Sequence, residues 1–550
     1  MITARTWIAG AGVVFALALA AGCHDSAKKA SPALAASAVQ NEGRTFPLLR
    51  VTWGSMDYLD PGLAYTSYAW MLMEHVYLGL VGYRWTTGSE GATIVPALAQ
   101  HLPAVSSHGT DYRFTLRPNL RYSDGTEVRA SDFKASIERL FKIDSPGVGF
   151  FTQIVGAPRF AKTKSGPLPG IVVDDEKRTI EIKLSTPRAD FLNILGIPFA
   201  AVLPASTPPS DQSTTAIPAT GPYMVQSYRP RRTFVLIRNP RYKVVPGIPP
   251  GNPDKLIGMI MENPTAALET VLRGKSDFMM GVPPDRLAEV QNKHRARLKL
   301  YTPASTYYFA LNERLPPFNS LKARQAVNYA IDRQALVQAN GGLGIATQNV
   351  LPPTYPQYRK IDFYRHDIGR AKRLVAESGT SGMTVTVWGV NQSPSREATL
   401  YLTDLLNKVG WKAAPKLLAG AVFVQTVGNQ ATRAQIVWLN WYQDYPHPLD
   451  WFDASFNGNR ITQVHNSNIG NVDFSDVNVA IERLKRAGGS AAGSNEAWAK
   501  VDHDLVVKHA AVAPYMNAEG ADFLGAGIDP GCYYNHVLFL FDWTAICAKR

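Results

Sequence analysis

Residues 112–133 read YRFTLRPNLRYSDGTEVRASDF, and this stretch decides the fold class. Apolar and polar side chains alternate from residue 112 to residue 117, which predicts a strand with one buried face. A turn at Gly125 follows, and Ser131 is then a suitable N-cap for a helix. Residues 133–141 place apolar side chains on one face of that helix. The stretch therefore predicts a strand, a turn and a helix in succession.

The same two patterns alternate along the rest of the chain. A second alternating strand is predicted at 180–184, and further amphipathic helices are predicted at 323–331, 367–378, 402–409 and 475–487. No internal repeat is visible, which argues against a solenoid. Because strands and helices alternate, the sequence predicts an α/β fold.

The segment at 113–133 resembles the signature of the family 5 extracellular solute-binding proteins, which are the peptide, nickel and oligosaccharide receptors of ABC importers. Further segments match blocks of that family in the same order: Leu59-Asp60-Pro61, Thr220-Gly221-Pro222-Tyr223, residues 238–242, 317–318, 324–326 and 330–333, and Trp441-Tyr442-Gln443-Asp444-Tyr445-Pro446. The resemblance covers nearly all of residues 46–550. It is therefore not the product of one short motif.

The resemblance implies a two-lobed periplasmic-binding-protein clamp of type II, cluster C, with an extra domain. Lobe one would combine residues 46–88, 216–302 and 514–550, the extra domain II would hold residues 89–215, and lobe two would run from 303 to 513. The Pro/Ser/Thr-rich stretch 204–215 lies where the chain would re-enter lobe one. Such stretches are typical of crossings between domains.

The candidate binding site lies around Asp444. Residues 436–441 predict a strand that Pro446 ends, because proline has no N–H for the ladder. In the peptide-binding relatives that the sequence resembles, the residue matching Asp444 pairs with the free α-amino group of the peptide, and the one matching Trp441 packs beside it. Tyr442 lies between these two positions. The alternative is an aspartate that only caps the turn before Pro446.

Tyr65 and Ser67 are the candidates from lobe one, because they match positions at which relatives contact the peptide. The alternative is an ordinary loop. The sequence does not fix a cation for a ligand carboxylate. Arg433 is a candidate by its position only, and a solvated surface arginine is the competing interpretation.

Aromatic residues crowd into the same region, at Trp438, Trp441, Tyr442, Tyr445, Trp451 and Phe452. Aromatic side chains in a strand are more often packed in the core than exposed as a platform. Exposed aromatic faces also suit sugar rings, however, so an oligosaccharide or a metal complex remains an alternative ligand of the same transport class.

The first 22 residues predict a signal peptide, with Arg5 ahead of an apolar run and small residues at its end. The exit Leu19-Ala20-Ala21-Gly22-Cys23 resembles a bacterial lipobox, which would make Cys23 the lipid attachment site. Ordinary cleavage with an incidental Cys23 is the alternative. Residues 23–45 are rich in Ala and Ser and predict a flexible tether. The protein is therefore expected in the periplasm or on the outer face of the cytoplasmic membrane.

Only three cysteines occur in the chain. With Cys23 assigned to the anchor, Cys532 and Cys547 form an even pair in an oxidising compartment, which favours a disulfide. Two buried thiols are the alternative.

The composition limits the possible functions. The 550 residues carry a net charge of +13 with 45% hydrophobic residues, which fits a globular chain. Lys and Arg are dispersed through every segment, so no nucleic-acid partner is predicted. The apparent phosphate loop at Gly274-Lys275-Ser276 lacks its first glycine, and neither H-E-x-x-H nor G-x-S-x-G occurs. No cofactor, metal or catalytic residue is predicted.

The leading interpretation is a non-enzymatic receptor, expected to be a monomer. It would capture peptides between two lobes and deliver them to an ABC permease. A secreted hydrolase is a weaker alternative, since no nucleophile, base and oxyanion group can be named together.

Overall fold

The computed structural model describes residues 46–106, 108–487 and 494–549. The strand predicted at 112–117 is β5 (Asp111–Thr115), which pairs with β7 (Thr179–Lys183). The helix after it is α2 (Ala130–Lys142). Alternating strands and helices recur along the chain, so the predicted α/β fold is confirmed.

The prediction that Ser131 caps α2 is wrong. The helix begins at Ala130, and the backbone N–H of Arg129 donates to Oδ2 of Asp132 at 2.8 Å. The Ser131 hydroxyl donates instead to Asp175, also at 2.8 Å. The Asp132 carboxylate in the first turn accepts the backbone N–H at the start of the helix, so the Ser131 hydroxyl is available for another partner.

The first lobe contains a seven-stranded sheet in the order β12-β19-β11-β1-β10-β9-β8. Its strands are β1 (Leu49–Trp53), β8 (Tyr223–Arg229), β9 (Thr233–Arg238), β10 (Lys255–Ile260), β11 (Phe278–Met279), β12 (Leu298–Tyr301) and β19 (Gly520–Leu524). The helices around this sheet are α1 (Ser67–Val76), α6 (Pro264–Leu272) and α7 (Pro284–His294). The first lobe also contains two short antiparallel strand pairs. They are β2 (Val81–Tyr83) with β3 (Ile94–Pro96), and β20 (Asn535–His536) with β21 (Leu540–Phe541).

A four-stranded antiparallel sheet in the order β4-β5-β7-β6 belongs to the region of the signature segment. Its outer strands are β4 (Ala104–Val105) and β6 (Ile171–Asp174), and its helices are α2, α3 (Val148–Phe151), α4 (Ala157–Thr163) and α5 (Phe191–Ile194). Its buried side chains form one continuous core with those of the seven-stranded sheet. These two sheets therefore share a single packing unit.

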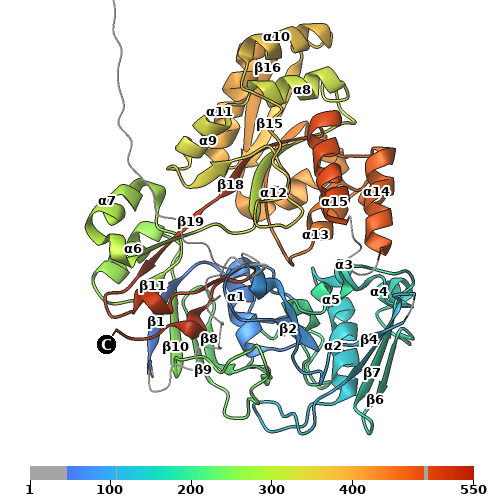
Figure 1. Cartoon of the computed structure of the whole chain (residues 1–550), viewed down its shortest axis with the longest axis vertical. Helices are drawn as coiled ribbons and strands as arrows, with labels where there is room; N and C mark the ends of the chain where they lie inside the picture. Colours follow the sequence, from blue (N-terminus) through green and yellow to red (C-terminus); the bar gives the residue numbers. More distant parts are fainter. Residues whose placement is uncertain (1–45, 107, 488–493, 550) are drawn as a thin grey trace, which may run out of the picture. The chain divides into compact units, whose positions relative to one another are not determined.

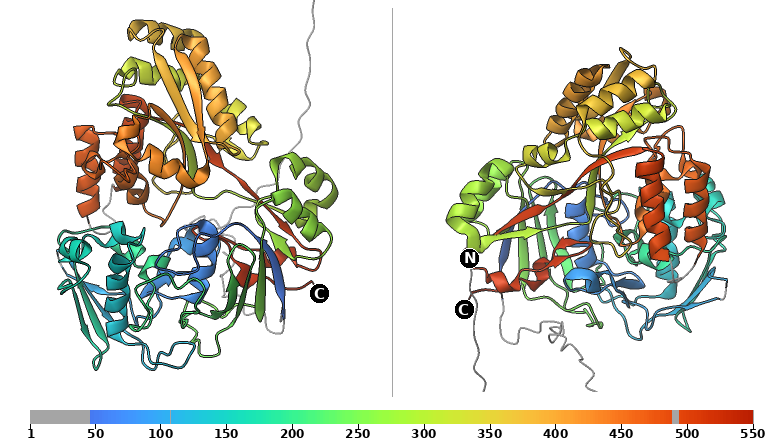
Figure 2. Two further views of the ribbon diagram at one scale, coloured as in Figure 1. Left: turned by 180° about the vertical axis from the view of Figure 1, so that it is seen from behind. Right: turned by 45° about the horizontal axis from the view of Figure 1, so that its top comes forward.

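The second lobe is built on a six-stranded sheet in the order β14-β18-β13-β17-β15-β16. Its strands are β13 (Ser305–Leu311), β14 (Gly344–Ala346), β15 (Thr384–Val390), β16 (Lys412–Leu418), β17 (Ile436–Tyr442) and β18 (Val512–Ala518). The helices are α8 (Leu321–Ala330), α9 (Arg333–Ala339), α10 (Ile368–Glu377), α11 (Ser395–Val409), α12 (Gly420–Val427), α13 (Pro448–Phe456), α14 (Ser475–Arg486) and α15 (Ser494–His503). Helix α11 packs on β15 and β16. Figure 2 shows these elements, drawn yellow to orange, from two further sides. This lobe has its own core.

In the described part of the chain, two short segments join the two sheets: residues 302–304 link β12 to β13, and Glu519 links β18 to β19 (Figure 1). The links lie side by side, because β12 pairs with β19 and β13 pairs with β18. At Gly520 an added Cβ would lie 2.2 Å from the ring of Tyr301, so a larger residue there would require this ring to move.

These links refine the predicted domain division. Since β18 belongs to the six-stranded sheet, the second crossing falls at Glu519, later than the predicted boundary at residue 514. The other predicted boundaries stay a prediction.

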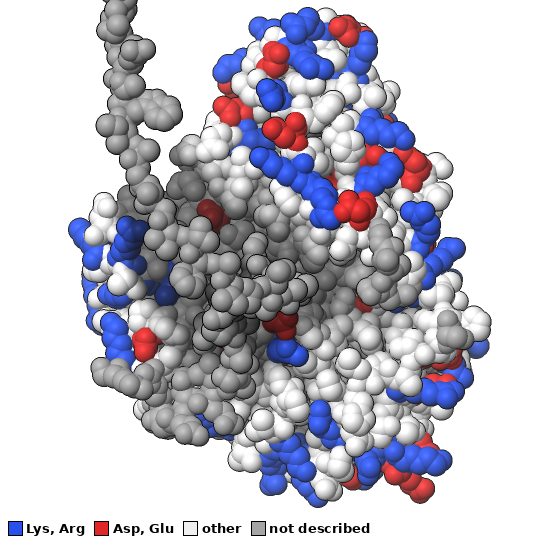
Figure 3. Space-filling model, viewed as in Figure 1, with Lys and Arg blue, Asp and Glu red and all other residues white. Residues whose placement is uncertain are grey.

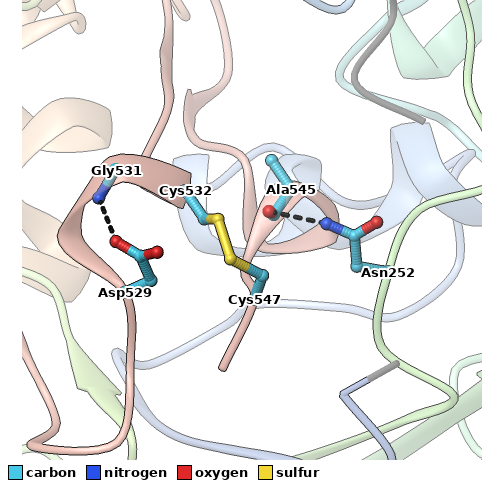
Figure 4. The surroundings of a disulfide bond; sticks show 6 residues. All are labelled: Asn252, Asp529, Gly531, Cys532, Ala545 and Cys547. Carbon is cyan, nitrogen blue, oxygen red and sulfur yellow. Dashed lines mark hydrogen bonds between the residues drawn. A yellow bond between two sulfur atoms is a disulfide. The ribbon is translucent and has the colours of Figure 1, made fainter. Parts of the chain in front are cut away.

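The structure joins Cys532 and Cys547 by a disulfide, with Cα atoms 5.6 Å apart (Figure 4). Beside it, Nδ2 of Asn252 donates to the carbonyl of Ala545 at 2.9 Å, which ties the C-terminal segment to the loop before β10. The enclosed loop of residues 533–546 carries residues that line the candidate site below. Together with Asp529, these two cysteines are the single metal-ligand grouping among the described residues, but their sulfurs are bonded to each other.

No helix in the described ranges is long and apolar enough to span a membrane. On the face drawn in Figure 3, Lys and Arg are interspersed with Asp and Glu over both lobes. Cys23 and the predicted signal peptide and tether lie outside the described residues.

Candidate functional site

A cavity of about 220 Å³ lies where the end of β17, the start of α1 and the C-terminal segment meet. It therefore has walls from both lobes. Its lining residues are Tyr65, Ser67, Trp70, Met71, Trp441, Tyr442, Gln443, Asp444, Leu538, Phe539 and Leu540.

Strand β17 positions the lobe-two wall. It pairs along its whole length with β13, and Tyr442 lies opposite Ser305 at the end of the ladder. The chain then turns toward α13, whose first turn carries Asp450. Oδ2 of this buried side chain accepts hydrogen bonds from the backbone N–H of Asp444 at 2.9 Å and from Nε1 of Trp441 at 3.2 Å. Asp450 therefore fixes both residues of the cavity wall.

A loop before α1 positions the lobe-one wall. The carboxylate of Asp57 accepts hydrogen bonds from the backbone N–H groups of Tyr65 at 2.7 Å and Thr66 at 3.1 Å. The Tyr65 ring packs between Trp70 and Phe199, with ring centroids 5.6 and 5.5 Å away. Its hydroxyl is thereby directed across the cavity, where it donates to Oδ2 of Asp444 at 2.7 Å.

The electrostatics of the cavity are dominated by two carboxyl groups. Burial raises the pKa of Asp444, and the hydrogen bond from Tyr65 opposes part of that shift. Burial also raises the pKa of Asp450 well above its usual value, and the nearby charge of Asp444 raises it further. None of the residues that line the described cavity is Lys, Arg or His. A cation entering here would relieve the repulsion between the two carboxyl groups.

Two further hydrogen bonds join lobe two to the first packing unit beside the cavity. Nε2 of Gln443 donates to the carbonyl of Val537 at 2.6 Å. Next to it, Tyr445 is buried in the core of the first packing unit, and its hydroxyl donates to Oδ2 of Asp190 at 2.7 Å. Gln443, Asp444 and Tyr445 are consecutive in the sequence. The turn after β17 therefore contacts both the C-terminal segment of lobe one and the region of the four-stranded sheet.

The structure brings together all five residues that the sequence proposed: Tyr65, Ser67, Trp441, Tyr442 and Asp444. Arg433 does not line the cavity, because it lies just before the opposite end of the seven-residue strand β17. Of the six clustered aromatic residues, Trp441 and Tyr442 line it, whereas Trp438, Tyr445, Trp451 and Phe452 are buried in the packed interior. The cluster is therefore mainly structural.

The sequence reasoning missed Trp70, Met71, Gln443 and the C-terminal residues 538–540. Trp70 lies three residues after Ser67 in the first turn of α1, so helical spacing could have found it. Asp450 could have been found from its place in the first turn after Pro448, where a carboxylate satisfies free N–H groups. Residues 538–540 carry no local signal, since contacts with distant parts of the chain bring them to the cavity.

Comparison with known proteins agrees with this architecture. The sequence profile described as bacterial extracellular solute-binding proteins, family 5 Middle, matches residues 93–463. The protein named "Probable D,D-dipeptide-binding periplasmic protein DdpA" from Escherichia coli K12 is 26% identical over 416 residues, which cover 73% of this chain and 76% of that protein.

Solved structures show the same two-lobed fold. One is titled clavulanic acid biosynthesis oligopeptide binding protein 2, with a TM-score of 0.84, 24% identity, and coverage of 92% of this chain and 96% of that one. Another is the DppA protein of Helicobacter pylori in complex with the peptide STSA, with a TM-score of 0.76, 19% identity, and coverage of 93% and 100%. Because the family profile matches more than half of the sequence, the chain belongs to the family 5 bacterial extracellular solute-binding proteins.

Proposed function

We propose that this protein is the substrate-binding component of an ABC importer and captures short peptides by their free amino group. The observation that carries the proposal is the position of Asp444, a carboxylate at a cavity between two lobes, with the hydroxyl of Tyr65 at 2.7 Å. A peptide ammonium would bind Asp444 in place of this hydroxyl or beside it. Trp441 and Tyr442 would pack against the peptide backbone or its first side chain.

Capture requires contacts from both lobes. A ligand shifts an open-to-closed equilibrium only if it binds one of the two states more tightly. Asp444 belongs to lobe two, whereas Tyr65 and Ser67 belong to lobe one, so a ligand between them favours the closed form. The paired links at residues 302–304 and Glu519 would act as the hinge.

The remaining parts of the proposal concern the cellular setting. The protein would be exported, attached to the membrane through a lipid on Cys23, and active as a monomer that passes its cargo to a permease. It would catalyse no reaction. Its domains would follow the predicted boundaries, with lobe two extended to the end of β18.

Small-angle X-ray scattering with and without a short peptide tests the clamp, after calorimetry has established that the peptide binds. The radius of gyration is expected to fall on binding. Stoichiometric binding with an unchanged radius would argue against closure. Release of shortened peptides by the purified protein would instead favour the hydrolase alternative.

A further inference from the structure

One edge of the seven-stranded sheet is formed by the amino ends of four strands. Strand β1 is parallel to β10 and β11, and both β11 and β12 are antiparallel to β19, so β1, β10, β11 and β12 run in the same direction. Helices α6 and α7 lead into β11 and β12, which places the carboxyl ends of both helices at this edge. We call it the amino edge of lobe one.

Five exposed cations of the described chain gather at the amino edge. Arg273 and Lys275 follow α6, Lys293 lies in the last turn of α7, and Arg295 follows α7. The backbone N–H of Lys549 donates to the carbonyl of residue 527, just beyond the end of β19, at 2.9 Å. Figure 3 draws Lys and Arg side chains over α6 and α7, at the left of the molecule.

Two acidic side chains of this edge are already bound by arginines. Asp277, at the start of β11, is paired with Arg50 at 3.0 Å. Asp254, just before β10, is paired with Arg238 at 2.7 Å. The half-buried Asp529 also lies here and accepts the N–H of residue 531 at 2.9 Å. These acids therefore neutralise little of the charge on the five cations.

The cations themselves are weakly engaged. Arg273 and Lys293 each reach a glutamate one turn earlier on the same helix, at 4.0 and 3.2 Å, and exposed pairs of this kind contribute little. Lys275, Arg295 and Lys549 form no ion pair within the described ranges. Cations at the ends of helices complement the helix dipole, but Lys549 belongs to neither helix. The amino edge therefore presents an excess of positive charge to solvent.

The described chain begins at this same edge. The carbonyl of Phe46 accepts the N–H of Asp254 at 3.1 Å, directly before β10. The predicted tether 23–45 precedes it, and a flexible chain of that length spans roughly 26 Å. One lipid anchor is usually supplemented by a second attachment signal, for which a polybasic patch suffices.

We propose that the amino edge binds the anionic headgroups of the membrane that carries the anchor. This inference goes beyond peptide capture and rests on the lipid attachment proposed at Cys23. Tyr65 and Ser67 follow the carboxyl end of β1, so the cavity lies at the opposite edge of the sheet. Attachment through the amino edge therefore leaves the cavity accessible to ligand.

Vesicle cosedimentation tests the proposal. The chain from residue 23 onward is used with Cys23→Ser, so that no lipid on the protein contributes. It is expected to bind vesicles of phosphatidylglycerol and phosphatidylcholine in equal parts at about 0.1 M salt, and to be released at about 1 M, where the screening length is only ~3 Å. Absence of binding, or equal binding to vesicles of phosphatidylcholine alone, would overturn the proposal.

A matched pair of variants separates the amino edge from the net charge of the protein. Each Lys or Arg near an anionic membrane surface strengthens binding about fivefold, so Arg273→Gln/Lys275→Gln/Arg295→Gln should weaken binding at least about tenfold. The control, Arg365→Gln/Lys372→Gln/Arg373→Gln, removes the same charge from exposed side chains of lobe two and should leave binding nearly unchanged. Equal losses in the two folded variants would overturn the proposal. Calorimetry with a peptide on the same proteins tests peptide capture separately, so the failure of one proposal is distinguished from the failure of the other.

Discussion

The hydroxyl of Tyr65 donates a 2.7 Å hydrogen bond to Oδ2 of Asp444, although the two residues lie 379 positions apart in sequence. This bond joins the two lobes at the cavity where a ligand ammonium would bind. The protein thus supplies a hydrogen-bond donor to a half-buried carboxylate. Because of this contact, we expect the two lobes to approach each other without ligand. We also expect a ligand cation to bind Asp444 in place of the Tyr65 hydroxyl.

Replacement of the anchor is expected to weaken peptide binding. Asp444→Asn keeps the size of the side chain but removes its charge, and truncating a buried charge pair typically costs ~2 to 5 kcal/mol. The affinity for an amine-bearing peptide should fall about 30-fold or more in calorimetry. Asp404→Asn, at an exposed carboxylate of α11 paired with Lys408, is the matched control. Equal affinities in the two variants would rule out Asp444 as the anchor.

Removal of the Tyr65 hydroxyl is expected to open the unliganded protein. Tyr65→Phe keeps the ring packing against Trp70 and Phe199 but deletes the bond to Asp444. A hydrogen bond to a charged group contributes ~1.5 to 3 kcal/mol, enough to shift an equilibrium about tenfold or more. The unliganded radius of gyration should increase. Tyr58→Phe, an exposed tyrosine of the same loop, controls for loss of a hydroxyl, and an identical radius in all three proteins would contradict the role of the bond.

Peptide binding is expected to weaken as the pH falls from 7.5 to 5.5. The ammonium binds the ionised form of Asp444, and burial raises the pKa of this group, so protonation begins well above the ordinary value of ~3.9. Bound ammonium favours the ionised form, so binding at low pH should release protons, which calorimetry in buffers of different ionisation enthalpy detects. Asp444→Asn should abolish the dependence. A flat profile in the wild type would show that Asp444 is ionised throughout this range.

Loss of the disulfide is expected to reduce both stability and affinity. The cysteines are 15 positions apart, and closing a loop of this length contributes about 3 kcal/mol in the chain-entropy model. The enclosed loop carries Leu538, Phe539 and Leu540 of the cavity wall. The double variant Cys532→Ser/Cys547→Ser should therefore unfold at lower denaturant concentration and bind peptide more weakly. Unchanged values for both would mean that packing alone holds this loop.

Local pattern predicted much of the fold. The alternation at β5 and the apolar stripe of α2 were correct because one buried face decides each of them. The cap of α2 was wrong because the helix begins at Ala130, one residue before Ser131. The sequence does not reveal that Asp175, a residue 44 positions farther along the chain, accepts hydrogen bonds from both the backbone N–H and the hydroxyl of Ser131.

At the site, Asp444 and Trp441 could be predicted because they follow directly from the end of one strand. The place of residues 538–540 in the cavity wall could not be predicted, since it depends on the disulfide and on packing against the rest of lobe one. The burial of Trp438 agrees with the expectation that aromatic side chains in a strand pack in the core, but the sequence does not show that Tyr445 packs into the core of the first packing unit. Strand periodicity identifies alternate faces, but it does not tell which of two opposing lobes covers each face.

Native mass spectrometry of the purified protein mixed with alanyl-leucine amide tests the central claim most directly. The account predicts a one-to-one complex that contains the intact ligand and is lost in Asp444→Asn but kept in Asp404→Asn. A spectrum in which the ligand is cleaved, or in which the wild type and Asp444→Asn retain it equally, would contradict an amine-capturing receptor.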